Sequence, residues 1–208
     1  MNIISYDGNG NLLAFARTPV GRSAYLWDHG GSALIAEAAN AVPSDIAYTS
    51  FEADGSGNWT IGSTARSGGG LTGTRSYDIS LGTITKGGLS AGTTYVISFW
   101  ARSGAPIFSA GAPVAGRTKD GWTFYQKTFS GVTGIQLSGT GLVDEVTLRP
   151  ANAYMKTYVH LPGVGVSCKV DENGYAEYYE YDSLGRLKFI RNGNGEIVRK
   201  IEYNYQIQ

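Results

Sequence analysis

Residues 181–190 read YDSLGRLKFI, and residues 6–15, near the other end of the chain, read YDGNGNLLAF. Both stretches fit the pattern Tyr-Asp-x-x-Gly-(Asn/Arg)-Leu. More than a hundred residues of different composition separate the two copies. One short pattern at both ends of a chain indicates that the ends share a structure, and that the middle is a different unit.

Glycines recur at fixed intervals around each copy. Spacings of 11 and then 10 residues separate Gly10, Gly21 and Gly31 near the start, and Gly174, Gly185 and Gly195 near the end. Asp182 stands three positions before Gly185, which is typical of a type I turn closed by a glycine with positive φ. Strand–turn–strand units at this spacing predict a β-meander at each end. An isolated pair of hairpins is marginal in water, so we expect residues 3–42 and 152–208 to share one sheet.

Composition favours short strands throughout. The 208 residues include 30 Gly and 14 Tyr, and 42% are hydrophobic, which is enough to bury a core. Glycine supplies tight turns and tyrosine favours strands. The one window with helical character is residues 32–41, SALIAEAANA, because of its alanines. The sequence therefore predicts an all-β protein.

Charge and hydropathy exclude several classes of partner. The formal net charge is zero, with 17 basic and 17 acidic residues, which argues against nucleic acid or an anionic membrane as the main partner. No apolar run is long enough for a membrane helix, so we expect no membrane insertion. The N-terminus, MNIISYDGNGN, lacks the features of a signal peptide and begins within the repeat pattern. We therefore expect a fragment of a longer protein, monomeric as a fragment.

The segment between about residues 45 and 150 has longer candidate strands. In residues 93–102, TTYVISFWAR, strand alternation places Tyr95 and Phe99 on one face and Trp100 and Arg102 on the other. The other candidate strands are residues 46–52, 75–82, 121–129, 133–139 and 143–150. Six or more strands in about 105 residues predict an antiparallel β-sandwich.

The two terminal segments resemble YD repeats, the hairpin units of RHS-type cell-surface and toxin proteins. The match covers about residues 3–42 and 152–208, with the correct motif spacing at both ends. The resemblance implies hairpins side by side in a spiralling sheet. About four to six strands would here form a small additional sheet, its edges left for neighbouring YD repeats of the parent chain.

The middle segment resembles carbohydrate-binding modules of the galactose-binding-like jelly-roll class. The matching residues are Phe51, Glu52, Trp59, Leu89, Ala91, Gly92, Tyr95, Phe99, Ala101 and Asp144 to Leu148. We therefore expect N-terminal YD-repeat hairpins over residues 1–44, a jelly-roll sandwich over residues 45–150 and C-terminal YD-repeat hairpins over residues 151–208. The sandwich would be an insertion that the chain enters and leaves at one end.

The same resemblance implies a structural calcium ion. In these modules an acidic residue after the first strand and another on the last strand help to hold Ca²⁺, and Glu52 and Asp144 occupy those positions. Asp54 follows Glu52 by two residues and could supply a further oxygen. The alternative is that these are ordinary polar residues at strand ends.

Sugar recognition uses aromatic rings together with polar side chains. Trp100 is the best candidate for the ring, Arg102 lies on the same strand face, and we expect Tyr125 to join that face. The alternative is that Trp100 packs beneath a loop or against the YD hairpins. Trp59 and Trp122 are expected to be core residues.

No catalytic constellation emerges from the sequence. His29 and His160 do not stand at a metal-ligand spacing, and the lone Cys168 is expected to be a small buried residue. Asp144 and Glu145 are neighbours on a strand, so we expect opposite faces rather than a glycosidase pair. The sequence predicts a non-catalytic, extracellular or cell-surface module that binds glycan within a YD-repeat protein. The alternative is a structural spacer or a protein-contact domain.

Overall fold

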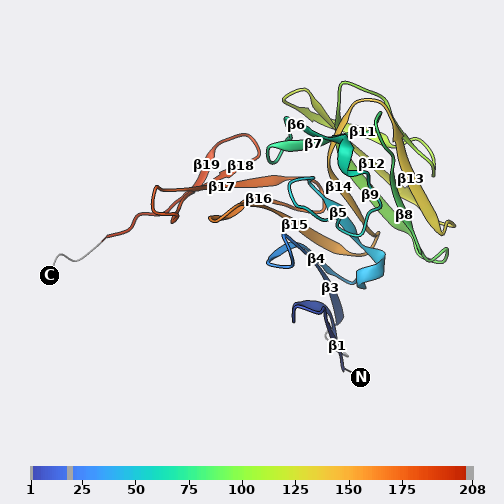
Figure 1. The fold of residues 1–208 in the computed structure, drawn as a ribbon, viewed down its shortest axis with the longest axis horizontal. Coiled ribbons are helices and arrows are strands. Elements are labelled where there is room, and N and C mark those ends of the chain that lie inside the picture. The colour runs from blue at the N-terminus through green and yellow to red at the C-terminus, as the bar shows by residue number, and fades with distance from the viewer. Residues whose placement is uncertain (1, 18–20, 205–208) are drawn as a thin grey trace.

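The computed structural model describes residues 2–17 and 21–204 (Figure 1). Residues 1, 18–20 and 205–208, which belong to the predicted terminal repeat segments, lie outside the described residues. The described chain is built from strands with two short 3-10 segments, η1 (Pro43–Asp45) and η2 (Ser63–Ala65). The all-β prediction is confirmed. In the described ranges, no helix is long and apolar enough to cross a membrane.

Two antiparallel sheets of the middle segment form the predicted sandwich. Within the described residues, the larger one, here the middle sheet, has seven strands: β11 (Val114–Lys119), β12 (Trp122–Phe129), β9 (Tyr95–Arg102), β14 (Leu142–Pro150), β7 (Arg75–Asp78), β6 (Arg66–Gly68), and β5 (Ala47–Thr49) beside β14. The short sheet comprises β10 (Pro106–Phe108), β13 (Gly134–Gly139) and β8 (Ile84–Gly87). Buried side chains of both sheets, including Phe99, Val146, Phe108 and Leu137, form one core between them.

The two ends of the chain share one antiparallel sheet, as the repeat pattern predicts. This long sheet has, among the described residues, nine strands in the order β1 (Asn2–Tyr6), β2 (Leu12–Arg17), β3 (Gly21–Asp28), β4 (Ala33–Ala39), β15 (Tyr154–Leu161), β16 (Gly165–Val170), β17 (Ala176–Tyr181), β18 (Leu187–Asn192) and β19 (Ile197–Lys200). The join is β4 against β15, with Ala39 opposite Tyr154. The sheet is larger than expected, because every turn of the repeat starts a new strand.

The sandwich is inserted at that join. The side-chain amide of Asn40 donates to the carbonyl of Asn152 over 3.3 Å, where the chain leaves and re-enters the long sheet. Entry and exit therefore lie at one end of the sandwich, and the long sheet continues across the gap.

The repeat turns explain the Asp-x-x-Gly motif. The N–H of Gly185 donates to the carbonyl of Asp182 over 2.9 Å, and Gly185 has a φ of 74°. The carboxylate of Asp182 accepts the N–H groups of Leu184 and Arg186 at 2.9 and 3.0 Å. These bonds and the hydrogen bond from the Arg186 side chain lower the pKa of Asp182. The carboxylates of Asp7 and Asp171 accept backbone N–H groups of their own turns in the same way.

The helical character expected for residues 32–41 is wrong, because residues 33–39 form β4. Its neighbours β3 and β15 provide backbone partners on both sides. Its alanines also suit close packing: Ala36 and Ala38 are buried against a cluster that includes Ile46 and Tyr48. Sheet pairing therefore overrides the helix propensity of alanine.

The central strands of the long sheet pack against the outer face of the middle sheet and add a third layer there, while both ends of the long sheet project beyond the sandwich (Figure 1). One end of the contact is apolar, where Met155 of the long sheet shares a buried cluster with Tyr48 of the middle sheet. The other end contains Trp100, Trp122 and Phe124 of the middle sheet. The outer face of the sandwich, where a ligand was expected, is therefore an interface between two sheets.

Candidate functional site

Trp100 points from β9 toward the long sheet, on the face opposite to the sandwich core. Its side chain is only 4% exposed, and its ring centroid lies 5.3 Å from that of Phe124. The predicted alternation of this strand is confirmed, since Ile97 and Phe99 lie in the core. Trp100 thus packs among side chains of the middle sheet and the loop before β7, at the interface with the long sheet.

The other two predicted ligand-binding residues separate. Arg102 shares the face of Trp100, stacks 4.7 Å from the ring centroid of Trp122 and donates to the carbonyl of Gly69. The expectation that Tyr125 joins this face is wrong. Tyr125 lies directly opposite Phe99, and cross-strand partners share a face, so their rings stack in the sandwich core at 5.5 Å.

Trp59 and Trp122 are buried, as expected, but in two different places. Trp59 is 3% exposed, lies in the sandwich core and donates to the carbonyl of Val146 over 3.2 Å. Trp122 is 1% exposed but lies on the outer face, in the cluster of Trp100. Cys168, also predicted to be buried, packs within the long sheet beside Val159 and Val170.

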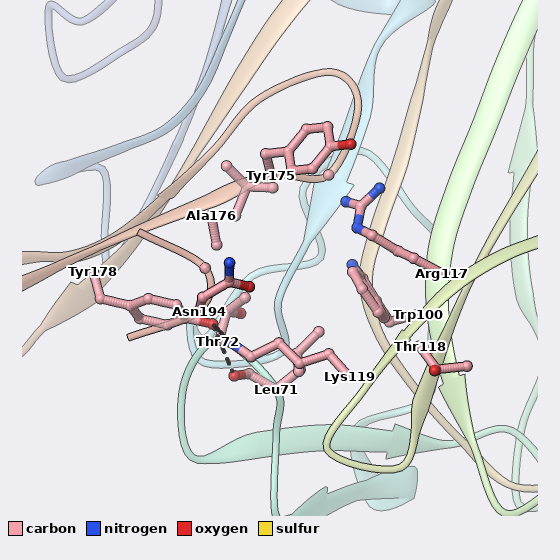
Figure 2. A pocket seen from close by; sticks show the side chains of 13 residues that line it. Leu71, Thr72, Trp100, Arg117, Thr118, Lys119, Tyr175, Ala176, Tyr178 and Asn194 are labelled. Carbon is pink, nitrogen blue, oxygen red and sulfur yellow. Dashed lines mark hydrogen bonds between the residues drawn. The ribbon is translucent and has the colours of Figure 1, made fainter. Parts of the chain in front are cut away.

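A cavity of about 140 Å³ lies between the middle sheet and the long sheet, and Trp100 forms part of its wall (Figure 2). Its lining comes from three places: β9 and β11 of the middle sheet, the loop before β7, and the long sheet around β17. The labelled lining residues are Leu71, Thr72, Trp100, Arg117, Thr118, Lys119, Tyr175, Ala176, Tyr178 and Asn194.

Arg117 is the central cation of this pocket. Its guanidinium lies 5.1 Å from the ring of Trp100, 4.7 Å from that of Phe124 and 4.1 Å from that of Tyr175. It also donates to the carbonyl of Asn173 over 2.8 Å, so one residue links the two sheets. Such cation–π contacts orient the guanidinium while leaving N–H groups for a ligand.

Lys119 supplies a second cation beside a tyrosine. Its ammonium lies 4.8 Å from the ring centroid of Tyr178 and 3.3 Å from that residue's hydroxyl. Burial raises the pKa of Tyr178, so its hydroxyl stays protonated and neutral. The sequence prediction missed Arg117, Lys119, Tyr175 and Tyr178. The one local signal was the alternation of Arg117 and Lys119 about Thr118.

The predicted calcium ligands hold a loop instead of forming one cluster. The carboxylate of Glu52 accepts the N–H of Thr74 at 2.6 Å and also that of Arg75. Asp144 is fully buried and accepts the N–H of Leu71 at 2.7 Å. Asp54 is exposed. In the part of the chain that the structure describes, no three His, Cys, Asp or Glu side chains come together as a metal site.

Calcium at Glu52 and Asp144 stays a prediction. The backbone N–H groups that donate to these carboxylates occupy lone pairs that the ion would need. If it binds, calcium should raise the melting temperature and a chelator should lower it, since an ion held by the folded state alone stabilises that state. Glu52→Gln should abolish the difference. Superimposable melting curves in calcium and in chelator would show that these carboxylates serve only the loop.

Asp144 and Glu145 point to the same face, which contradicts the expected alternation. Glu145 has a φ of 53°, and the pairing of β14 with β9 shifts register between Asp144 and Thr147. Val143 and Val146 both face the core. The β-bulge therefore leaves the two residues between them in the sequence, Asp144 and Glu145, on the opposite face. The two carboxyls therefore lie together at the interface with the long sheet.

Hydroxyl groups surround the carboxyl of Glu145. It accepts the hydroxyls of Thr72 at 2.6 Å, Tyr48 at 2.9 Å and Thr157 of the long sheet at 3.4 Å. Burial, together with the charge of the neighbouring carboxyl, raises the pKa of Asp144, and burial raises the pKa of Glu145 to about 7. The pair links both sheets to the loop that lines the pocket.

Comparison with models of protein families found no match, and comparison with curated proteins found none either. The likeness to YD repeats and to carbohydrate-binding modules therefore rests on the motifs of this chain.

Proposed function

We propose that this protein is a non-catalytic carbohydrate-binding module of the extracellular space or cell surface, within a YD-repeat protein. The terminal sugar of a glycan would occupy the pocket between the sandwich and the long sheet. The observation that carries the proposal is the pocket's lining: the indole of Trp100 stands with the tyrosines Tyr175 and Tyr178, beside Arg117 and Asn194.

The pocket has the chemistry to hold part of a sugar ring. Its volume of about 140 Å³ is close to the roughly 150 Å³ of a cavity that binds benzene, which has half the non-hydrogen atoms of a hexopyranose, so the ring would extend into the adjoining space. Its aromatic walls suit the apolar face of a pyranose, and the amide of Asn194 can pair with hydroxyls. An adjoining hollow of about 630 Å³ shares Lys119, Tyr178 and Asn194 with the pocket, which leaves room for further sugar units.

Tyr175→Ala should weaken glycan binding by at least tenfold without unfolding the protein. Tyr175 is 62% exposed, so its removal empties a wall of the pocket at little cost to the core. A glycan array would identify a ligand, and calorimetry would compare the variants. Tyr154→Ala is the matched control, since Tyr154 is 66% exposed on the same sheet and does not line the pocket.

Equal affinities for both variants would place the glycan elsewhere. If the array finds no ligand for the folded protein, the second function gains support.

That second function is a structural spacer within a longer sheet. Within the described residues, β1 and β19 each have a strand partner on one side only. Both carry exposed apolar side chains, including Ile4, Ile197 and Val198. Unpaired, apolar edges favour pairing with further strands, and neighbouring YD repeats of the parent chain would supply them.

A further inference from the structure

We propose that the pocket selects a negatively charged sugar, with a hexuronate as the simplest member of that class. This inference rests on the proposed function and adds the charge of the ligand. It concerns the cavity between Trp100, Arg117 and Lys119 on the middle sheet and Tyr175 and Tyr178 on the long sheet (Figure 2).

The lining of the pocket carries two cations and no carboxylate. Arg117 and Lys119 are its charged residues, and no Asp or Glu is among the residues that line it. Across the described part of the chain, the ion pairs involve other residues, so neither cation has a carboxylate within 4.0 Å. Both side chains are half-buried, where a charge loses part of its hydration and gains more from an anion than at an open surface.

The nearest buried acids lie behind the wall. Asp144 and Glu145 contact the pocket lining through Thr72, which donates its hydroxyl to Glu145. Burial raises the pKa of both carboxyls, so near neutral pH the pair retains part of its protons and carries less than two negative charges. Two cations at the pocket therefore exceed the negative charge directly behind it, so an anionic group would balance the pocket itself, whereas Asp120 and Glu180 line the adjoining hollow.

The positions of the side chains match a ring that bears a carboxylate. Figure 2 shows Arg117 and Trp100 across the cavity from Tyr178, with Lys119 below and Tyr175 above. Arg117 lies over the rings of Trp100 and Tyr175, and Lys119 lies over the ring of Tyr178, so a sugar in the pocket would direct its carboxylate to these two cations. A guanidinium already oriented by three rings loses little freedom on binding such a group.

The test compares oligogalacturonates with neutral oligogalactosides of equal length by calorimetry, at about 20 mM and 300 mM NaCl. We expect at least tenfold tighter binding of the acidic ligand at low salt, and a loss of that preference at high salt, because salt screens the charges. Sulfated oligogalactosides distinguish the carboxylate from other anions. Tighter binding of the sulfated ligand would overturn the uronate assignment.

Lys119→Gln should reduce the preference for the acidic ligand at least fivefold, because it removes one of the two cations that line the pocket. Lys127→Gln is the matched control, because Lys127 is also half-buried, lies on the adjacent strand β12 and does not line the pocket. Equal binding of acidic and neutral ligands would overturn this inference and leave the proposed function intact. Binding of neither class, by a protein with normal circular dichroism, would overturn both.

Discussion

Replacing Trp100 by alanine should lower the free energy of unfolding by about 3–5 kcal/mol, as other large-to-small substitutions in packed interiors do. The indole is only 4% exposed and packs against Phe124 beneath the guanidinium of Arg117. Its removal leaves an empty volume beside the pocket and removes one of the rings that orient Arg117. Chemical denaturation followed by circular dichroism measures the change.

Two further variants make this result specific. Trp100→Phe keeps a ring in the interface and should recover most of the lost stability. Val114→Ala, on the exposed side of β11, should stay within about 0.5 kcal/mol of the parent protein. A loss below about 1 kcal/mol for Trp100→Ala would contradict the packed, buried position of this indole.

The shared sheet could be predicted because its signals are local. Asp182 and Gly185 define a turn by their own hydrogen bond and dihedral angles, and Asp7 with Gly10 repeats it at the other end. Each turn joins two strands, and exposed edges require partners. The hairpins at each end therefore follow from residues within a few positions of one another, and the distant pairing of β4 with β15 follows because both are edges that need a partner.

The inward and outward faces could be predicted only where a strand is regular. Trp100 points outward because β9 alternates without interruption. Tyr125 was misplaced because its face depends on its register with Phe99, which lies on another strand. The faces of Asp144 and Glu145 were predicted wrongly because a single positive φ at Glu145 forms a β-bulge, and no typical turn residue in the sequence signals that bulge. Both errors arise from contacts that neighbouring residues do not determine.

The pocket itself lay beyond sequence reasoning for the same reason. Arg117 belongs to the sandwich and Tyr175 to a repeat turn, and the two meet only because the sheets dock face to face. The helical character expected for residues 32–41 was wrong for a similar reason, since pairing with β3 and β15 makes this segment strand β4. Local patterns predicted the sheets, whereas the docking of the sheets created the site.

Glu145→Gln should stabilise the protein at pH 8 by up to about 3 kcal/mol and weaken its dependence on pH. Burial raises the pKa of Glu145 to about 7 from its ordinary value of 4.5. Between these two values the folded state keeps a proton that the unfolded chain releases. Stability is therefore greatest below about pH 4.5 for this group, falls as the pH rises from about 4.5 to about 7, and levels off above that. A neutral glutamine removes that fall, at about 1.36 kcal/mol for each unit of pKa shift.

Glutamine also suits the hydrogen bonds of this site. Its Oε1 can accept the hydroxyls of Tyr48 and Thr72, which now donate to one oxygen of Glu145. Its Nε2 can donate to the hydroxyl of Thr157, which can act as donor or acceptor. The substitution therefore removes the buried charge and can keep hydrogen bonds to Tyr48, Thr72 and Thr157. Unfolding free energies measured from pH 4.5 to 8.5 should show the variant and the parent protein diverging as the pH rises.

Asp144→Asn provides the opposing control. Both oxygens of Asp144 accept backbone N–H groups, from Leu71 and Thr72 on one side and from Glu145 on the other. An asparagine must turn its NH₂ group toward one of these donors, which leaves a buried N–H unsatisfied at a cost of about 1–3 kcal/mol at every pH. At pH 8 the two neutral replacements should therefore change stability in opposite directions. If both destabilise the protein equally at all pH values, the buried pair is held fully ionised by its hydrogen bonds, and the raised pKa of Glu145 is wrong.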